Sequence, residues 1–289
     1  MSCLPSASRG LTEAQREQIA DLYLELLKKT LSRSLFDELF VPLSPKRGTL
    51  RSTVFAPVRR LLEARGLVLA RSLRASESFA TSPPARVPEA ETLIGPVGID
   101  NLRYCIEDVL RRDVPGDLIE TGVWRGGASI FMRAALEAHG DVTRTVWAAD
   151  SFQGLPSPDL TPHPEDAGDA GWAERDWLAI PLEEVKQNFA RYGVLDERVQ
   201  FLSGWFHETL PSAPIEQLAL LRLDGDMYGS TMDALRFLYP RLSVGGYVIV
   251  DDYWLPRCKA AVDRYRADHG IVEELVQVDR AIAYWQRRL

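Results

Sequence analysis

The feature that most constrains the fold is an alternation of short apolar segments with amphipathic segments, beginning at about residue 98. Segments with the composition of strands lie at 116–122, 145–152, 199–206, 218–226 and 245–254, and segments with helical periodicity lie at 101–110, 127–140, 182–193, 231–242 and 258–270. Residues 272–278 and 281–288 are expected to close the sheet as a terminal pair. This pattern predicts an α/β fold with a mainly parallel, seven-stranded, Rossmann-like sheet, helices on both faces, and ligands at the carboxyl ends of the strands.

The N-terminal part has a different pattern. Thr12 and Gln15 form a capping-box signature, and apolar residues then recur at helical spacing, which predicts a helix over about 13–32. Residues 45–75 combine many arginines with apolar residues at helical intervals, as in a solvated helix face near an oligomer contact, although a specific anion site is the alternative. The proline-rich segment 80–90 is predicted to be a linker. We expect a helical cap with oligomer contacts and a lid region over residues 1–97, and the α/β core over 98–289.

Composition narrows the classes of partner and location. The formal net charge of −7 argues against nucleic acid as a partner, because phosphate recognition needs surplus Lys and Arg. The three cysteines are far apart and match neither a disulfide framework nor a zinc site. No charge-free stretch reaches the length that a bilayer requires, so we expect no membrane partner and a cytoplasmic location.

Aspartates are concentrated at the ends of two predicted strands. Asp224 and Asp226 lie at the end of the segment 218–226, and Asp251 and Asp252 lie near the end of the segment 245–254. Four carboxylates at adjacent strand ends repel one another unless a cation lies between them. Oxygen ligands without His or Cys favour Mg²⁺ over Ca²⁺ or Mn²⁺. Helix capping is the alternative role for Asp226 and Asp252.

Asp226 has the position of a general base. In an extended backbone its side chain projects in the same direction as that of Asp224, one step further out, so it can face a substrate instead of an ion. A carboxylate is a weak base toward an alcohol, but a bound metal lowers the pKa of the hydroxyl and makes such a base sufficient.

The first core strand ends with Glu120 and Thr121, and Gly122 and Gly126–Gly127 follow before a helix. Glycines there let a backbone approach a ligand closely, but Glu120 replaces the first glycine of G-x-G-x-x-G, which suits an ammonium-bearing ligand better than a dinucleotide. Asp150 ends the second strand, where a carboxylate accepts hydrogen bonds from ribose, with a turn cap as the alternative. Ser203 and Trp205 follow the third strand, where an adenine is expected, and Trp205 is alternatively a core residue.

Several of these segments together resemble the macrocin O-methyltransferase family of antibiotic biosynthesis. The resemblance rests on "GDLIETGVWRGGAS", "ADSFQGLPSPD", "LEEVKQNFARYG", "GWFHETLP", "RLDGDMYGSTMDAL" and "GGYVIVDDYW", and it runs from about residue 90 to the C-terminus. It implies a class I methyltransferase core, S-adenosylmethionine and Mg²⁺, with Asp226 as general base and Asp224, Asp251 and Asp252 as metal ligands. The implied cofactor contacts are Glu120, Gly122, Asp150 and Ser151, with residues 91–95 closing over the cofactor. We expect Thr121, Ser129, Ser203 and Asp224 to add further cofactor contacts.

Two positions depart from the family pattern. Gly229 stands where an acidic residue commonly precedes the Ser-Thr pair, and Trp254 stands where a small residue commonly follows the aspartate pair. Both flank the expected site, so acceptor preference is expected to differ. Residues 153–177, which are acidic, proline-rich and aperiodic, are interpreted as a lid over the substrate or as a surface insertion. The histidines receive no role, although His207 is placed to touch the cofactor.

These observations predict a homo-oligomeric, Mg²⁺-dependent O-methyltransferase that acts on a sugar hydroxyl of a glycosylated natural product. One alternative is methylation of a phenolic or catechol-like hydroxyl. A nicotinamide-dependent oxidoreductase on a similar sheet and a non-catalytic module that retains the cofactor site are the others.

Overall fold

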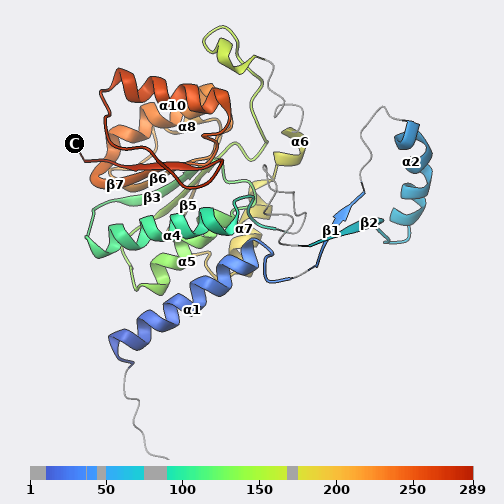
Figure 1. Cartoon of the computed structure of the whole chain (residues 1–289), viewed down its shortest axis with the longest axis horizontal. Coiled ribbons are helices and arrows are strands. Elements are labelled where there is room, and N and C mark those ends of the chain that lie inside the picture. Colours follow the sequence, from blue (N-terminus) through green and yellow to red (C-terminus); the bar gives the residue numbers. More distant parts are fainter. Residues whose placement is uncertain (1–10, 37, 44–49, 75–89, 168–174, 289) are drawn as a thin grey trace, which may run out of the picture.

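A central sheet organises the computed structural model (Figure 1). The structure describes residues 11–36, 38–43, 50–74, 90–167 and 175–288. In that part of the chain, seven strands lie in the order β5-β4-β3-β6-β7-β9-β8. Their bounds are β3 Asp117–Thr121, β4 Val146–Asp150, β5 Val199–Ser203, β6 Leu218–Leu223, β7 Leu242–Val250, β8 Val276–Gln277 and β9 Ala283–Gln286.

The topology confirms the predicted Rossmann-like sheet. Strands β3 to β7 pair in parallel, and β9 pairs antiparallel with both β7 and β8, as expected for a closing terminal pair. The chain runs outward from β3 through β4 to β5 and then returns to place β6 beside β3. The carboxyl ends of β3 and β6 therefore form the switch point where open α/β sheets bind ligands.

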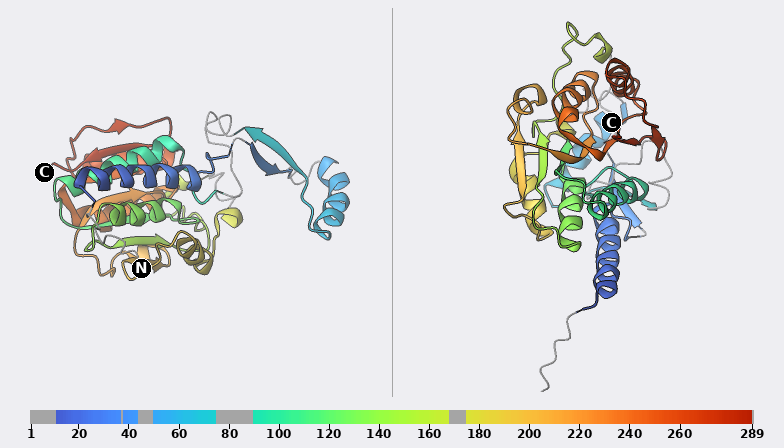
Figure 2. Two further views of the ribbon diagram at one scale, coloured as in Figure 1. Left: turned by 90° about the horizontal axis from the view of Figure 1, so that it is seen from below. Right: turned by 90° about the vertical axis from the view of Figure 1, so that its left-hand side faces the viewer.

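Helices cover both faces of the sheet (Figure 2). One face packs against α1 (Glu13–Leu31), α4 (Pro96–Arg111), α5 (Gly127–Ala138) and α7 (Leu182–Arg191), and the other against α8 (Phe206–Thr209), α9 (Tyr228–Leu238) and α10 (Pro256–Asp268). Each face of the sheet has its own hydrophobic core, and successive residues of a strand point into different cores. Leu220 belongs to the core under α4 and α5, and Leu221 belongs to the core under α9 and α10. Burial on both faces explains why these strands read as continuous apolar runs.

The predicted N-terminal helix is confirmed. Thr12 and Gln15 form a capping box at the start of α1, and Leu24, Leu27 and Leu31 bury one face of the helix in the first core. Full burial of side chains of this size stabilises the fold by about 1.5–3 kcal/mol each.

The expectation that the rest of the N-terminal part is helical is wrong for residues 70–74. Strand β2 (Ala70–Arg74) pairs antiparallel with β1 (Glu38–Pro42), and the helix between them in the described residues is α2 (Leu50–Glu63). This arm extends away from the sheet (Figures 1 and 2). A partner strand about 30 residues away leaves no trace in local periodicity. The predicted linker at 80–90 lies, except for Ala90, outside the described residues, so the division at residue 97 stays a prediction.

Two strand ends also differ from the prediction. Strand β6 stops at Leu223 instead of residue 226, because Asp226 adopts a left-handed backbone conformation with φ 58°. Strand β7 stops at Val250 instead of residue 254, because residues 251–254 form a turn before α10. The short elements η1 (Pro164–Asp166), α6 (Arg175–Leu178) and η3 (Tyr239–Arg241) complete the described structure.

Candidate active site

A cavity of about 1130 Å³ opens at the carboxyl edge of the sheet, over the switch point. This volume exceeds that of most single-ligand pockets, so it has room for a cofactor together with an acceptor. Its walls come from the loops after β3, β4, β6 and β7, from the segments 93–97 and 154–166, from the start of α9, and from residues 279–282.

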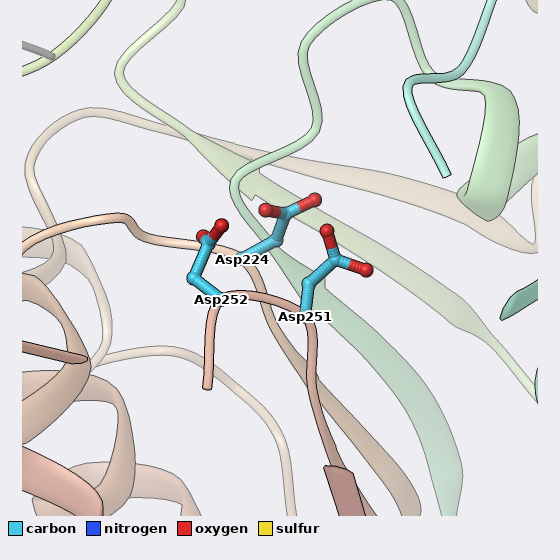
Figure 3. Close-up of side chains that lie close together, drawn as sticks. All are labelled: Asp224, Asp251 and Asp252. Carbon is cyan, nitrogen blue, oxygen red and sulfur yellow. The ribbon is translucent and has the colours of Figure 1, made fainter. Parts of the chain in front are cut away.

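Three of the predicted metal ligands converge in this cavity (Figure 3). Leu223 pairs with Val250 in the β6–β7 register, so Asp224 and Asp251 follow at the same level of the sheet. Asp224, Asp251 and Asp252 each offer an oxygen, and these atoms all lie within 4.8 Å of one another. The convergence that sequence reasoning predicted is therefore present.

A buried arginine that sequence reasoning missed lies against this cluster. The Arg222 guanidinium, 2% exposed, contacts Glu120 at 2.5 Å, Asp251 at 2.6 Å and Asp224 at 2.8 Å. Arg222 is therefore a cation supplied by the protein itself for three of the carboxylates. The sequence does contain a sign of this contact, because an arginine inside the apolar run "LALLRL" has to pair with a buried acidic partner.

Arg222 does not neutralise the whole cluster. Burial raises the pKa of Asp251 to about 8, with the neighbouring carboxylates Asp224 and Glu120 adding to the rise. Burial, followed by repulsion from Asp226, raises the pKa of Asp252 well above its usual range. Burial and mutual repulsion therefore disfavour the charged forms of Asp251 and Asp252. A divalent cation favours the charged forms, so the three converging carboxylate oxygens fit a hard ion such as Mg²⁺.

Asp226 lines the same cavity, but not through the extended backbone that its spacing suggested. Its left-handed conformation turns the chain immediately after β6, and its N–H donates to Asp252 Oδ2 at 3.3 Å. Arg257 Nε donates to the Asp226 carbonyl at 2.9 Å. A non-glycine residue in this conformation costs about 1–2 kcal/mol, so the surrounding contacts must hold it.

The glycines of the loop after β3 allow close chain crossings. A Cβ on Gly122 (φ 91°) would lie 1.7 Å from the Asp224 carbonyl oxygen, and a Cβ on Gly127 would lie 2.5 Å from that of Glu91. Gly127 N–H donates to this Glu91 carbonyl at 2.9 Å. The loop after β3 therefore packs closely against Asp224, which follows β6, and against the segment 91–95, which is predicted to close over the cofactor.

Asp150 anchors the same loop. One carboxylate oxygen accepts from Val123 N at 2.7 Å and Trp124 N at 3.2 Å, and the other accepts from Phe152 N at 2.7 Å. The turn-cap alternative for Asp150 is therefore confirmed. Asp150 also lines the cavity beside Ser151. A carboxylate can accept more hydrogen bonds than these three, so the predicted contact with ribose hydroxyls is compatible with this role.

The predicted cofactor contacts divide into two groups. Gly122, Asp150, Ser151 and Asp224 line the cavity, as does Trp205. Glu120, Thr121, Ser129 and Ser203 do not belong to its walls in the described structure.

Glu120, Thr121 and Ser129 are buried beneath the wall of the cavity. Glu120, 2% exposed, accepts from the Ser129 hydroxyl and pairs with Arg222, while the Thr121 hydroxyl donates to the Arg222 carbonyl at 3.3 Å. Burial raises the pKa of Glu120 to about 7. Ser203 is exposed.

The Rossmann-like sheet, the acidic cluster at its switch point and the anchored glycine loop together fit a class I methyltransferase, the class that the sequence resemblance implies. The profile of the macrocin-O-methyltransferase (TylF) family matches residues 20–287, and the chain belongs to this family. It is therefore an S-adenosylmethionine-dependent O-methyltransferase, which rules out the nicotinamide-dependent oxidoreductase and the non-catalytic module.

Similar proteins agree with this assignment. The mycinamicin III 3''-O-methyltransferase of Micromonospora griseorubida is 44% identical over 269 residues, which cover 92% of this chain and 96% of that protein. The demethyldecarbamoylnovobiocin O-methyltransferase of Streptomyces niveus is 55% identical over 208 residues, 68% of this chain and 76% of that protein. The solved structure of the O-methyltransferase NovP superposes with a TM-score of 0.75 at 46% identity, covering 93% of this chain and all of that one.

Among the described residues, no helix combines the length and apolarity needed to span a bilayer.

Proposed function

We propose that the enzyme transfers a methyl group from S-adenosylmethionine to a sugar hydroxyl of a glycosylated natural product, with Mg²⁺ bound at the acidic cluster. The convergence of Asp224, Asp251 and Asp252 in a cavity large enough for two ligands carries the proposal. The names of two relatives support the substrate class, since one is named for mycinamicin III and the other for demethyldecarbamoylnovobiocin.

The methyl donor is assigned to the β3–β4 side of the cavity. Gly122, Asp150 and Ser151 line this side, and the segment 93–97 forms the adjoining wall. Backbone donors already hold the Asp150 carboxylate in place, so it is preorganised to accept from ribose hydroxyls.

The acceptor is assigned to the β6–β7 side. Asp224, Asp251 and Asp252 would hold Mg²⁺, which when bound lowers the pKa of a coordinated hydroxyl and orients it. Asp226 lines the cavity beside them and takes the role of the base that removes the hydroxyl proton. Arg222 offsets part of the repulsion between Asp224 and Asp251, because its guanidinium contacts both carboxylates.

A methyl-transfer screen tests this function. The purified enzyme is incubated with S-adenosylmethionine and a panel of macrolide and aminocoumarin glycosides, each beside its aglycone, with and without a chelator. We expect methylation of at least one glycoside on its sugar, located by fragment mass, abolished by chelator and restored by added Mg²⁺. Methylation of aglycones alone would instead establish a phenolic or other non-sugar acceptor, and chelator-resistant turnover would remove the metal from the proposal.

We also propose that the protein self-associates through α1. Ile19, Leu22 and Leu26 form an apolar stripe at helical spacing and are 51%, 66% and 54% exposed. Side chains of this kind gathered on one face mark contact surfaces. Changing Ile19 and Leu22 to serine should reduce the mass measured by light scattering, whereas Glu17→Ser, at an exposed position on the opposite face of the same helix, should not. An unchanged or monomeric mass throughout would refute this contact.

The predicted cytoplasmic location stands as a proposal as well. Cys105 and Cys258 are buried free thiols, which suits a reducing compartment. Fractionation of the producing cell tests it.

A further inference from the structure

Asp166 connects the segment 155–167 to α9, the helix that begins beside the acidic cluster. Its carboxylate, on a residue 2% exposed, accepts from Tyr228 N–H at 2.7 Å and from Gly229 N–H at 3.0 Å. Tyr228 and Gly229 are the first two residues of α9, which begins directly after the Asp224–Asp226 turn. A buried carboxylate thus joins the 155–167 segment to the acidic site.

This contact supplies what α9 lacks locally. The first N–H groups of a helix have no partner within the helix, and a side chain just before it usually accepts from them. Met227 holds the N-cap position of α9 and makes no such bond. Asp166, 62 residues earlier in the chain, takes this role, and its negative charge also favours the positive end of the helix.

Gly229 has a specific reason to be a glycine. A Cβ there would lie 2.8 Å from His163 Cδ2 and 3.4 Å from Asp166 Oδ2. The His163 ring also lies against the Tyr228 ring, with centroids 5.6 Å apart. Since glycine is a poor helix former, its presence in the first turn is explained by the room that His163 and Asp166 need. The glycine at position 229, where the family commonly has an acidic residue, therefore makes room for the segment 155–167 to pack against α9.

We propose that Asp166 is a positioning residue for the acceptor: it fastens the 155–167 segment to α9 and holds His163 as a wall of the acceptor site. His163, Asp166 and Gly229 all line the cavity, together with Asp226, on the β6 side of the site. This assignment rests on the proposed division of the cavity between methyl donor and acceptor. A wall held in advance spares the acceptor the cost of ordering it, so its loss weakens acceptor binding more than it slows the transfer.

The first experiment compares Asp166→Ala with Glu165→Ala. Glu165 is the exposed neighbour in the same short helix, so the control removes the same charge without the helix cap. When the cap is lost, the wall has to be ordered at the expense of acceptor binding, and the typical worth of a cap then converts to a rise in the acceptor KM of up to about tenfold. We expect this rise for Asp166→Ala only, with kcat and the affinity for S-adenosylhomocysteine within about twofold. An unchanged KM, or an equal rise in the control, would overturn the proposal.

The second experiment uses Gly229→Ala. Alanine favours the helix, so this variant should fold at least as well as the wild type, yet its methyl group displaces His163. We expect a raised acceptor KM, and little further effect of Gly229→Ala in a His163→Ala background, where the displaced ring is gone. Equal effects in both backgrounds would exclude His163 as the contact through which Gly229 acts.

Hydrogen exchange separates this inference from the proposed function, because it needs no acceptor. In Asp166→Ala, faster exchange should be confined to residues 155–167 and to the first turn of α9. Unchanged protection there would refute the fastening even if the enzyme methylates sugars. Confined loss of protection would support it even if the acceptor screen finds no glycoside.

Discussion

Replacement of Arg222 by methionine tests the charge balance of the site. Methionine fills a similar volume without the guanidinium, which leaves Glu120, Asp224 and Asp251 without their buried cation. Removing one partner from a buried ion pair typically destabilises a protein by about 3–5 kcal/mol. Because Asp224 and Asp251 are 29% and 16% exposed, water relieves part of the cost for these two. Glu120 is enclosed, so we expect a loss at the lower end, about 3 kcal/mol.

The loss should depend on pH in a defined direction. The pKa values of Glu120 and Asp251 in the folded protein are already raised to about 7 and about 8 by burial. Carboxyls with raised folded pKa values favour the fold while protonated and lose that contribution as pH rises through them. Stability of the metal-free protein should therefore fall between about pH 4.5 and pH 8, and removal of Arg222 should steepen the fall.

Urea unfolding of the metal-free proteins at pH 6 and pH 8.5 measures this effect. The difference between Arg222→Met and wild type should be large at pH 8.5 and smaller at pH 6, and added Mg²⁺ should stabilise the variant more than the wild type. Arg264→Met, which removes an exposed pair with Asp268, should leave the midpoint unchanged at both values. A loss below about 1 kcal/mol at pH 8.5, or one independent of pH, would refute the assigned role of Arg222.

Three further variants address the chemistry. Asp226→Asn should keep S-adenosylhomocysteine and Mg²⁺ binding, measured by calorimetry, while kcat falls by about 10²-fold or more, and normal turnover would exclude Asp226 as the base. Asp251→Asn should raise the Mg²⁺ concentration needed for half-maximal activity, so an unaltered metal titration would remove Asp251 from the ligand set. Gly122→Ala should not fold stably by circular dichroism, because its Cβ would overlap the Asp224 carbonyl oxygen; a stable, active variant would contradict the crossing at this point.

The local pattern of apolar and polar residues was sufficient to predict most strands and helices of the core. Strand and helix alternation follows from which residues can be buried, and each apolar run from β3 to β7 contains enough of that information by itself. The capping box of α1 is a contact between residues three apart, so the sequence shows it directly. The grouping of Asp224, Asp251 and Asp252 was also predictable, because parallel strands end at one edge of a sheet.

What the sequence by itself determined is therefore the sheet, the acidic edge and the family. Only the tertiary structure placed Arg222 against Glu120 and Asp251, turned Asp226 out of the extended conformation, and brought Asp166 to the start of α9. Arg222 and Glu120 are 102 residues apart, and Asp166 and Tyr228 are 62 apart. A periodic pattern records which way a side chain faces, but the identity of a distant partner is set by how the chain crosses itself after folding.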